Sequence, residues 1–337
     1  MPVLVVTTEE SGIDKYSQEI AERLGVKEIA TPRYMSTIEA FRLARLIRDE
    51  PDVVHLPNQN FARFAFLRRN PFIVTVHDVV RFYFHFDLEA IRERMWLKLD
   101  IMGAKRASHI IAVSQHTKND LIKYMEIPES KITVIYNGID RSIFKPYGVK
   151  LRLLDKPYVL YIGSERPRKN LGTLFEAFAK LKNEFPDLKL LKVGPVGRYD
   201  KYRKDSVRKL TSLGITRDVA FVDYVSEYDL VSYYCSAALL AYPSLYEGFG
   251  LPPLEAMACG CPVVTSNTSS LPEVVGEAGI MVEPYDIDGL AQAMRQVLSD
   301  SQLREEMVKK GLEQSKKFTW EKAAEQTREI YEKVAAG

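Results

Sequence analysis

The stretch ALLAYPSLYEGFGLPPLEAMACGCPVVT, residues 238–265, carries the pattern that decides the fold. Apolar runs at 238–242 and 261–265 have the length of buried strands, and an apolar stretch between them begins near Pro252 and ends before Gly260. A strand, a crossover helix and a second strand in this order form one unit of a parallel sheet. The stretch therefore predicts an α/β fold in which helices cover both faces of the sheet.

The same alternation runs along the whole chain. Twelve apolar runs are predicted strands: 3–6, 28–30, 53–56, 73–76, 109–113, 133–135, 158–162, 188–193, 219–222, 238–242, 261–265 and 279–282. The stretch 144–157 loses the periodicity and contains two prolines, so we place a linker there. This organisation predicts two Rossmann-like domains, 1–146 and 147–319, and a C-terminal helix at 320–337.

The composition is that of a soluble globular protein. The 337 residues are 46% hydrophobic and 27% charged, which excludes a disordered chain and is enough for two cores. Lys plus Arg number 47 and Asp plus Glu 45, so a nucleic-acid partner is not expected. No apolar stretch reaches the roughly 20 residues of a membrane span, and no basic segment precedes the first apolar run. We therefore expect a cytoplasmic protein, either soluble or peripheral at the inner face of the cell membrane.

Three cysteines and one acidic pair are the other candidates for special chemistry. Cys235, Cys259 and Cys261 lack the spacing of a zinc site, and we expect them to be reduced packing residues. Asp286 and Asp288 precede a predicted helix, where an N-cap explains the pair without a metal.

The loop 244–255 is the richest candidate for a ligand site. Parallel α/β sheets bind ligands beyond the carboxyl ends of their strands, where helix N-termini present free N–H groups. Gly248 and Gly250 let the backbone approach a ligand closely. The carboxylates Glu247 and Glu255 would repel a phosphate but would suit the hydroxyls of a sugar or a ribose. The alternative is that Glu247 caps the helix and Glu255 is a solvated helix residue.

The segment YPSLYEGFGLPPLEAMACGCPVVTSNTSSLPEVVGEAGIMVEP, residues 242–284, resembles the signature of the family 4 glycosyltransferases. Glu247 and Glu255 match the E-x7-E motif of that family, and further matches are VTVHD at 74–78, AVSQHTKNDL at 112–121, NGID at 137–140 and GSERPRKNL at 163–171. The resemblance implies a GT-B fold, with two Rossmann-like domains facing a central cleft and a C-terminal helix that crosses back to the N-terminal domain. The N-terminal domain would bind the acceptor and the C-terminal domain the donor.

The resemblance also implies roles for individual residues. Glu247 would bind hydroxyls of the transferred sugar, Glu255 the donor ribose, His77 the sugar, and Lys169 with Arg168 the diphosphate. The implied donor-binding set is Gly12, Arg168, Lys169, Tyr224, Val225, Glu247, Gly248, Phe249, Gly250, Leu251 and Glu255. The alternatives are that His77 is only a packed residue and that the Arg-Pro-Arg-Lys stretch at 166–169 is a solvated loop.

Two further positions leave alternatives open. Many relatives carry an arginine where this chain has Ser164, which leaves open whether Arg166 or Arg168 binds the diphosphate. Residues 223–226 follow a predicted strand, and Tyr224 suits stacking on a nucleobase as well as surface packing.

The implied reaction moves a hexose, with mannose as our choice, from a nucleotide-diphosphate sugar to an acceptor hydroxyl with retention. The donor would be GDP-mannose or a UDP-sugar, and no metal or other cofactor is expected. The family is described as using front-face attack, in which the departing phosphate takes the acceptor proton. The alternatives are a nucleotide-sugar epimerase, a phosphorylase, or a two-domain sugar-binding protein without catalysis.

The segment 61–106 bears on the acceptor. It interleaves aromatic residues with nine Lys or Arg against five Asp or Glu. This pattern suits an anionic membrane surface, so we expect a lipid-linked or phosphorylated acceptor. The rival interpretation is an acceptor pocket, or helices whose aromatic side chains form core.

Overall fold

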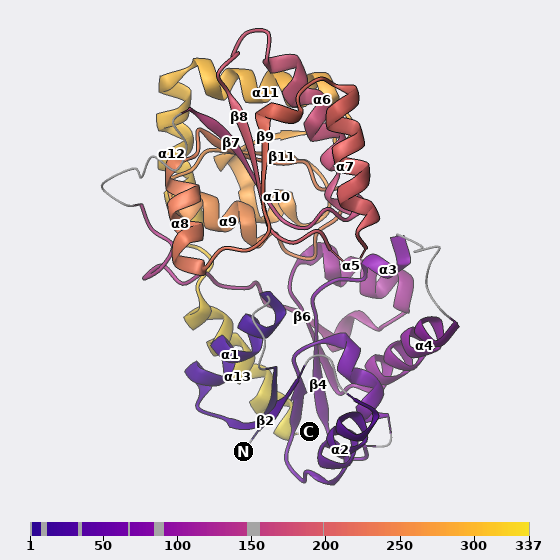
Figure 1. The fold of residues 1–337 in the computed structure, drawn as a ribbon. Helices are drawn as coiled ribbons and strands as arrows, with labels where there is room; N and C mark the ends of the chain where they lie inside the picture. Colours follow the sequence, from indigo (N-terminus) through magenta and orange to yellow (C-terminus); the bar gives the residue numbers. More distant parts are fainter. Residues whose placement is uncertain are drawn as a thin grey trace. The chain divides into compact units, whose positions relative to one another are not determined.

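The chain folds into two compact units (Figure 1). A computed structural model describes residues 2–7, 12–32, 36–66, 68–83, 91–146, 156–197 and 199–336. Unit 1 comprises Met1–Gly138 and Phe318–Gly337, and unit 2 comprises Ile139–Lys317. The structure therefore divides the chain eight residues before the predicted boundary at 146, because Phe144 packs edge-on against Tyr234 of unit 2 at 6.4 Å. Most of the predicted linker, residues 147–155, lies outside the described residues.

Unit 1 contains a parallel six-stranded sheet in the order β2-β1-β3-β4-β5-β6. Its strands are β1 (Val3–Thr7), β2 (Lys27–Thr31), β3 (Val54–Leu56), β4 (Phe72–Val76), β5 (His109–Ala112) and β6 (Ile132–Val134). Its described helices are α1 (Gly12–Leu24), α2 (Thr37–Asp49), η1 (Gln59–Ala65), α3 (Val80–Tyr83), α4 (Ile91–Arg106), α5 (Gln115–Met125), η2 (Glu129–Lys131) and α13 (Trp320–Ala336).

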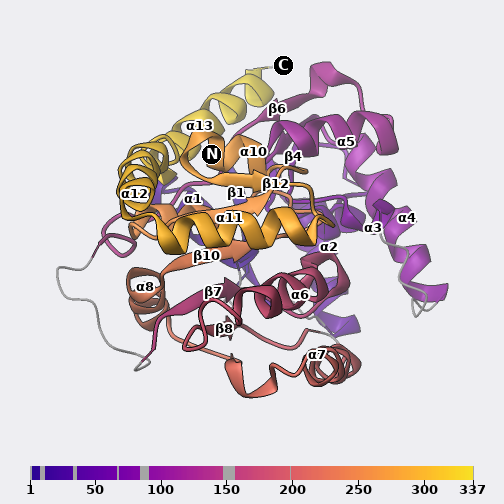
Figure 2. The ribbon, with the colours of Figure 1, turned by 90° about the horizontal axis from the view of Figure 1, so that it is seen from above.

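Unit 2 contains a second parallel six-stranded sheet, in the order β12-β11-β10-β7-β8-β9. Its strands are β7 (Tyr158–Ile162), β8 (Lys189–Val193), β9 (Val219–Val222), β10 (Leu239–Tyr242), β11 (Val263–Ser266) and β12 (Ile280–Val282). Its described helices are η3 (Pro167–Lys169), α6 (Leu171–Leu181), α7 (Lys201–Ser212), η4 (Thr216–Asp218), α8 (Glu227–Ser236), α9 (Leu251–Ala258), α10 (Leu271–Val275), η5 (Gly276–Ala278), α11 (Ile287–Ser299) and α12 (Ser301–Ser315). Helices α6 and α11 pack against each other (Figure 2).

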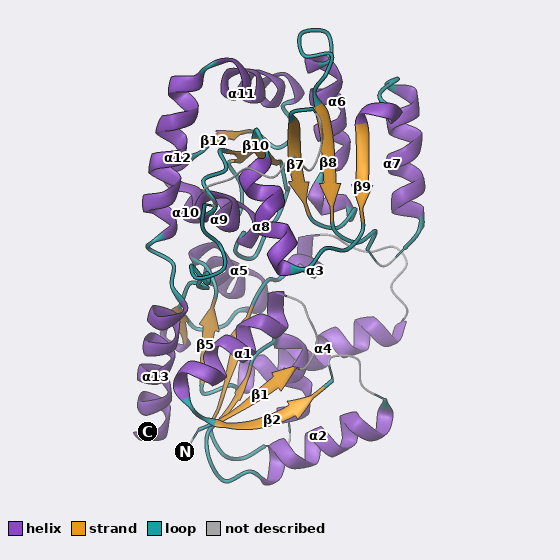
Figure 3. Ribbon diagram, turned by 60° about the vertical axis from the view of Figure 1, so that its left-hand side comes forward, coloured by secondary structure: helices purple, strands orange, loops and turns teal. Residues whose placement is uncertain are grey.

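The predicted α/β architecture is confirmed, and each predicted strand lies within two residues of an observed one. Central strands such as β1, β7 and β10 are buried along their whole length, since helices cover both faces of each sheet (Figure 3). The edge strand β2 exposes Lys27 and Glu28, which is where a parallel sheet tolerates charge. In the part of the chain that the structure describes, no helix is both long enough and apolar enough to cross a membrane.

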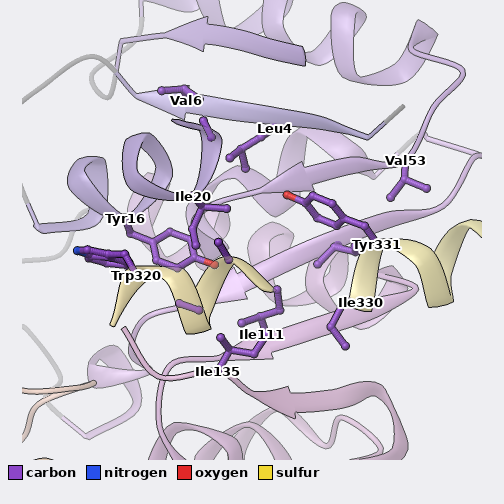
Figure 4. Packing of buried hydrophobic residues seen from close by; sticks show 14 of the residues in the cluster. Leu4, Val6, Tyr16, Ile20, Val53, Ile111, Ile135, Trp320, Ile330 and Tyr331 are labelled. Carbon is purple, nitrogen blue, oxygen red and sulfur yellow. The ribbon is translucent and has the colours of Figure 1, made fainter. Parts of the chain in front are cut away.

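The C-terminal helix α13 belongs to unit 1, as predicted. Trp320, Ile330 and Tyr331 of α13 enter one buried cluster with Tyr16 and Ile20 of α1 (Figure 4). At Gly138 a side chain would collide with this helix, because an added Cβ would lie 2.1 Å from the Trp320 nitrogen. Glycine therefore lets the end of the N-terminal segment touch the beginning of α13.

Candidate active site

Two loops at the carboxyl edge of the unit-2 sheet form the candidate site. β7 and β10 pair in parallel, with Val159 opposite Leu239, so the loops 163–170 and 243–250 leave the same edge side by side. In the first loop Pro167 begins the short helix η3, and Asn170 ends it with a left-handed φ of 56°. This turn places Arg168 and Lys169 against the second loop, which holds Glu247.

Glu247 and Lys169 form a buried ion pair. Lys169 Nζ lies 2.6 Å from Glu247 Oε1, and each side chain is only 9% exposed. The Tyr242 hydroxyl accepts from Lys169 Nζ at 2.5 Å and donates to Glu247 Oε1 at 3.0 Å. The Ser244 hydroxyl also donates to Glu247 Oε1, at 2.5 Å. Glu247 Oε1 thus has three donors.

Arg168 holds the other carboxylate oxygen. Arg168 Nη1 lies 3.0 Å from Glu247 Oε2 and donates to the Tyr246 carbonyl at 2.8 Å. Arg166 is exposed, so of the two candidate arginines it is Arg168 that joins the cluster. The solvated-loop alternative does not apply to Lys169, which is buried.

The cluster carries one more positive charge than negative. Burial raises the pKa of Glu247, but Lys169 and Arg168 lower it by more, to about 2. Burial lowers the pKa of Lys169 to about 8, although Glu247 raises it in part. At pH 7 Glu247 is therefore anionic while Lys169 and Arg168 are cationic. The excess charge lies at a strand edge, the place where an anionic ligand binds in this fold class.

Two serines that sequence reasoning missed support the Glu247 loop. The Ser269 hydroxyl accepts from the Glu247 backbone nitrogen at 3.0 Å, and the Ser270 hydroxyl lies 2.6 Å from the Phe249 carbonyl. Gly250 is the N-cap of α9 and has a φ of 116°, which only glycine adopts readily. These serines, like Tyr242 and Ser244, lie inside the segment 242–284 that resembles the family signature. Their place in that segment was the sequence signal that could have identified them as parts of the site.

Glu255 lies in α9, outside the Glu247 cluster. It is half-buried, and its Oε2 accepts from the Tyr234 hydroxyl at 2.7 Å. Burial raises the pKa of Tyr234 well above 10, so this phenol stays a neutral donor. The ribose role of Glu255 stays a prediction.

Tyr224 and Val225 line a cavity of about 430 Å³ beyond β9. Tyr224 is 74% exposed, which leaves its ring accessible for stacking. A larger cavity of about 1000 Å³ lies at the opposite edge of the unit-2 sheet, where Pro157, Ala238 and Pro262 precede their strands. It contains none of the predicted site residues.

Two predicted site residues belong to unit 1. Gly12 is the first residue of α1, and residues 8–11 before it lie outside the described part. His77 follows β4 and is buried. Its Nε2 lies 2.8 Å from the Pro57 carbonyl, so this nitrogen carries a proton. The Tyr16 ring meets the imidazole edge-on at 5.0 Å.

Part of the segment 61–72 is structural, as the rival interpretation held, whereas Arg69 is exposed. Phe61 and Phe72 are buried, because η1 and β4 carry them into the core. Arg63 Nε donates to Asp100 at 2.6 Å, and Arg68 is buried with its guanidinium on the carbonyls of 47 and 50. These cations are not available to a membrane. Residues 84–90, the aromatic stretch after Tyr83, lie outside the described residues.

The expected N-cap is confirmed, since the Asp286 carboxylate accepts from the Gly289 nitrogen at 2.8 Å. The three cysteines are free and buried, as predicted. Within the described ranges no group of three or more His, Cys, Asp or Glu is arranged to hold a metal ion. Metal independence stays a prediction.

Two family comparisons and several relatives match the chain. The family described as "Glycosyltransferase Family 4" matches residues 2–143, and "Glycosyl transferases group 1" matches residues 148–314. O-antigen chain mannosyltransferase B of Escherichia coli is 31% identical over 95% of this chain and 96% of its own length. MMP alpha-(1->4)-mannosyltransferase of Mycolicibacterium hassiacum is 28% identical over 88% of this chain and 75% of its own.

Solved structures share the fold. Sucrose-phosphate synthase from Thermosynechococcus elongatus has a TM-score of 0.82 at 24% identity and covers 99% of both chains. Anabaena Alr3699/HepE in complex with UDP-glucose has a TM-score of 0.83 at 20% identity, over 98% of this chain and 99% of that one. At these identities the likeness concerns the fold alone.

Proposed function

The chain belongs to the family 4 glycosyltransferases, and from this premise we propose that it transfers a mannosyl group from a nucleotide-diphosphate sugar to an acceptor hydroxyl with retention. The observation that carries the proposal is the positively charged cluster of Arg168, Lys169 and Glu247 at the edge of the unit-2 sheet. Two relatives named as mannosyltransferases support mannose, and GDP-mannose is our first candidate donor. A structure solved with UDP-glucose keeps a UDP-sugar as the alternative.

The diphosphate is the proposed ligand of Lys169 and Arg168. Negative charge develops on the leaving diphosphate as the glycosidic bond breaks, and cations fixed in advance stabilise it without reorganisation. The ion pairs with Glu247 hold both cations in place before the donor arrives. No side-chain base is needed if the departing phosphate takes the proton of the acceptor hydroxyl.

The sugar hydroxyl is the proposed ligand of Glu247 Oε2. Oε1 already accepts from Lys169, Tyr242 and Ser244, whereas Oε2 accepts from Arg168. An ionised carboxylate offers about four acceptor positions over its two oxygens. Glu247 Oε2 can therefore accept a further hydrogen bond from a sugar hydroxyl. The contact of His77 with the sugar is a further part of the proposal.

The proposed acceptor is a lipid-linked or phosphorylated molecule. The Escherichia coli relative is named for an O-antigen chain, which supports an acceptor that is itself a growing glycan. Assays with a lipid diphosphate-linked sugar and with the corresponding soluble sugar phosphate separate the two possibilities.

Ligand-induced stabilisation tests the donor. GDP, GDP-mannose, UDP and UDP-glucose are compared in thermal unfolding, with and without Mg²⁺. A ligand at 100 times its dissociation constant adds about 2.7 kcal/mol to the free energy of unfolding. We expect one nucleotide family to stabilise the chain, and Lys169→Met to abolish the increment.

The matched control is Lys309→Met, which removes an exposed lysine from α12. It should keep the full increment. An unchanged increment in Lys169→Met would refute the assignment of the diphosphate site. Release of nucleoside diphosphate without any acceptor would favour an epimerase over a transferase.

A further inference from the structure

Four charged side chains at the carboxyl edge of the unit-2 sheet have no part in the proposed reaction. They are Glu165, Lys192, Arg203 and Asp223, and they come from the loop after β7, from β8, from α7 and from the loop after β9. The strands β7, β8 and β9 are neighbours in the sheet and end at the same edge (Figure 3). We call these four residues the β7–β9 ion network.

Glu165 is the centre of this network. Its Oε1 lies 3.1 Å from Lys192 Nζ and 2.6 Å from Arg203 Nε, and the side chains of Glu165 and Lys192 are fully buried. Arg203 Nη2 lies 2.5 Å from Asp223 Oδ1, and its guanidinium lies over the Phe221 ring, 4.3 Å from the ring centre. One arginine of α7 therefore joins the loop after β7 to the loop after β9.

The network also holds the loop between these two, which follows β8. Lys192 Nζ donates to the carbonyls of Gly194 and Pro195 at 2.5 and 3.2 Å. The Glu165 backbone nitrogen donates to the Val196 carbonyl at 3.2 Å. Three consecutive loops at this edge are thus fixed to one another by ion pairs and by hydrogen bonds.

Stability does not explain a network of this kind. Desolvation of a buried ion pair costs about as much free energy as its attraction returns, and apolar side chains of similar volume often replace such a pair without loss. In the described part of the chain Glu165 Oε2 is buried without a hydrogen-bond partner, which is a further cost. What a buried network with fixed partners does provide is a single arrangement of the loops that carry it.

The loops at the two ends of the network hold the two halves of the proposed donor site. Glu165 lies in the loop 163–170, which also carries the proposed ligands of the diphosphate. Asp223 directly precedes Tyr224, whose exposed ring lines the cavity of about 430 Å³ beyond β9. A ligand that engages two sites gains affinity from both only while their separation matches its own length.

We propose that the β7–β9 ion network positions the donor, by setting the distance between the diphosphate site and a nucleobase site at Tyr224 so that a nucleoside diphosphate engages both at once. Arg203 is the positioning residue that links the two sites, and it acts through Glu165 and Asp223. Without it each site keeps its own ligand, but the affinity for the joined ligand falls. The inference rests on the proposed function, since it presupposes a nucleotide donor in unit 2.

Two ligands of different length test the proposal with the whole chain. Inorganic pyrophosphate reaches only the diphosphate site, and it is compared by isothermal titration calorimetry with GDP or UDP, whichever stabilises the wild type. In Arg203→Met the affinity for the nucleoside diphosphate should fall about tenfold or more, while the affinity for pyrophosphate should stay at the wild-type value. A merely structural role would lower both affinities or neither.

A second variant guards against misfolding of the first. Glu165→Leu with Lys192→Met replaces the buried ion pair by apolar side chains of similar volume. It should keep the wild-type free energy of unfolding and show the same selective loss of affinity for the nucleoside diphosphate.

The matched control is Arg295→Met in α11. The Arg295 side chain is 32% exposed, against 26% for Arg203. Its partner at 2.8 Å is Glu184, which lines the cavity at the opposite edge of the sheet. Because this ion pair lies away from the donor loops, the control should keep both affinities.

Three outcomes would overturn the proposal. They are an unchanged affinity for the nucleoside diphosphate in Arg203→Met, an equal loss of affinity for pyrophosphate, or a wild type that binds the nucleoside diphosphate but no pyrophosphate and so has no separable diphosphate site. A wild type that binds neither ligand would refute the proposed function, and this inference with it.

Discussion

The two units bury polar clusters of opposite character. In unit 1, Tyr16, Thr75, His55 and Tyr331 form a chain of hydrogen bonds without formal charge. In unit 2, Glu247, Lys169 and Arg168 form a cluster with an excess positive charge. In a neutral chain each polar group can find its hydrogen-bond partner within the chain. A buried excess of positive charge is instead stabilised by an anionic ligand. The comparison separates a structural cluster from a binding cluster.

The bonds of the unit-1 chain connect four side chains in series. The Tyr16 hydroxyl lies 2.9 Å from the Thr75 hydroxyl, and Thr75 lies 2.8 Å from His55 Nε2. His55 Nδ1 lies 2.7 Å from the Tyr331 hydroxyl.

This chain runs from Tyr16 of α1 to Tyr331 of α13. Burial lowers the pKa of His55 to about 3 and keeps it neutral. The chain therefore fixes α13 to the sheet of unit 1 and offers no free charge to a ligand.

The largest difference we expect between the two units is in their loss of stability in acid. All five histidines of the chain precede residue 117, so only unit 1 contains them. Burial lowers the pKa of His55 to about 3 and of His109 to about 4. As pH falls below 6.5 the unfolded state takes up protons that the folded state refuses, so stability is lost. Between pH 7 and pH 5 we expect a loss of about 2 kcal/mol from each histidine.

Tryptophan fluorescence measures this loss in unit 1 alone, because both tryptophans, Trp96 and Trp320, lie there. Urea unfolding is followed at pH 7 and at pH 5. In unit 2 the corresponding loss begins only below about pH 4.5, where Glu247 of the unfolded chain becomes protonated. Equal acid sensitivity of the two units would contradict the comparison.

Lys169→Met should destabilise unit 2 by about 3 kcal/mol, because it leaves the buried Glu247 short of one partner. The double variant Lys169→Met with Glu247→Gln removes both charges and should regain most of this loss. Urea unfolding followed by circular dichroism measures both. Equal stability of the single and double variants would show that the pair is not coupled.

Tyr331→Phe should destabilise unit 1 by about 2 kcal/mol, since His55 Nδ1 loses its hydrogen-bond partner in a buried site. The nucleotide-induced stabilisation of unit 2 should stay unchanged. Tyr285→Phe removes a hydroxyl from an exposed tyrosine and serves as the control. A lower affinity for nucleotide in Tyr331→Phe would mean that the unit-1 chain is more than structural.

Donor affinity should fall about tenfold between pH 7 and pH 9. The diphosphate binds the protonated form of Lys169. Because the pKa of Lys169 in the free chain is about 8, binding above this pH is accompanied by uptake of a proton. Calorimetric titration in two buffers of different ionisation enthalpy measures this uptake. A pH-independent affinity would exclude Lys169 as the diphosphate ligand.

Much of the fold could be predicted from the sequence. Parallel strands buried on both faces are continuous apolar runs, which is why β7 (Tyr158–Ile162) was predicted at its observed bounds. The edge strand β9 (Val219–Val222) was also predicted at its bounds, although it is not buried, because its sequence is an apolar run too. For the segment 61–72 the local pattern was a poor guide to which side chains are exposed. Its aromatic residues and arginines resemble a surface pattern, but Arg68 is buried because backbone carbonyls receive its guanidinium, and no local pattern reveals that.

The candidate site could be predicted as a set of residues but not as an arrangement. Glu247 and Lys169 were each predicted to touch the donor, and neither was predicted to pair with the other. Their side chains meet across 78 positions of sequence. The support from Ser269 and Ser270 was missed because serines in a loop carry no distinctive spacing.

The sequence by itself determined the α/β class, the order of strands and helices, and the loops in which the chemistry lies. Those features depend on local periodicity and on which residues bind backbone or charge nearby. The tertiary structure decided which loops meet. Because β10 pairs with β7, Glu247 reaches Lys169, and because α13 packs on the sheet of unit 1, Tyr331 reaches His55 across 276 positions. Strand order and helix docking minimise exposed apolar surface over a whole unit, and no short stretch of sequence contains that choice.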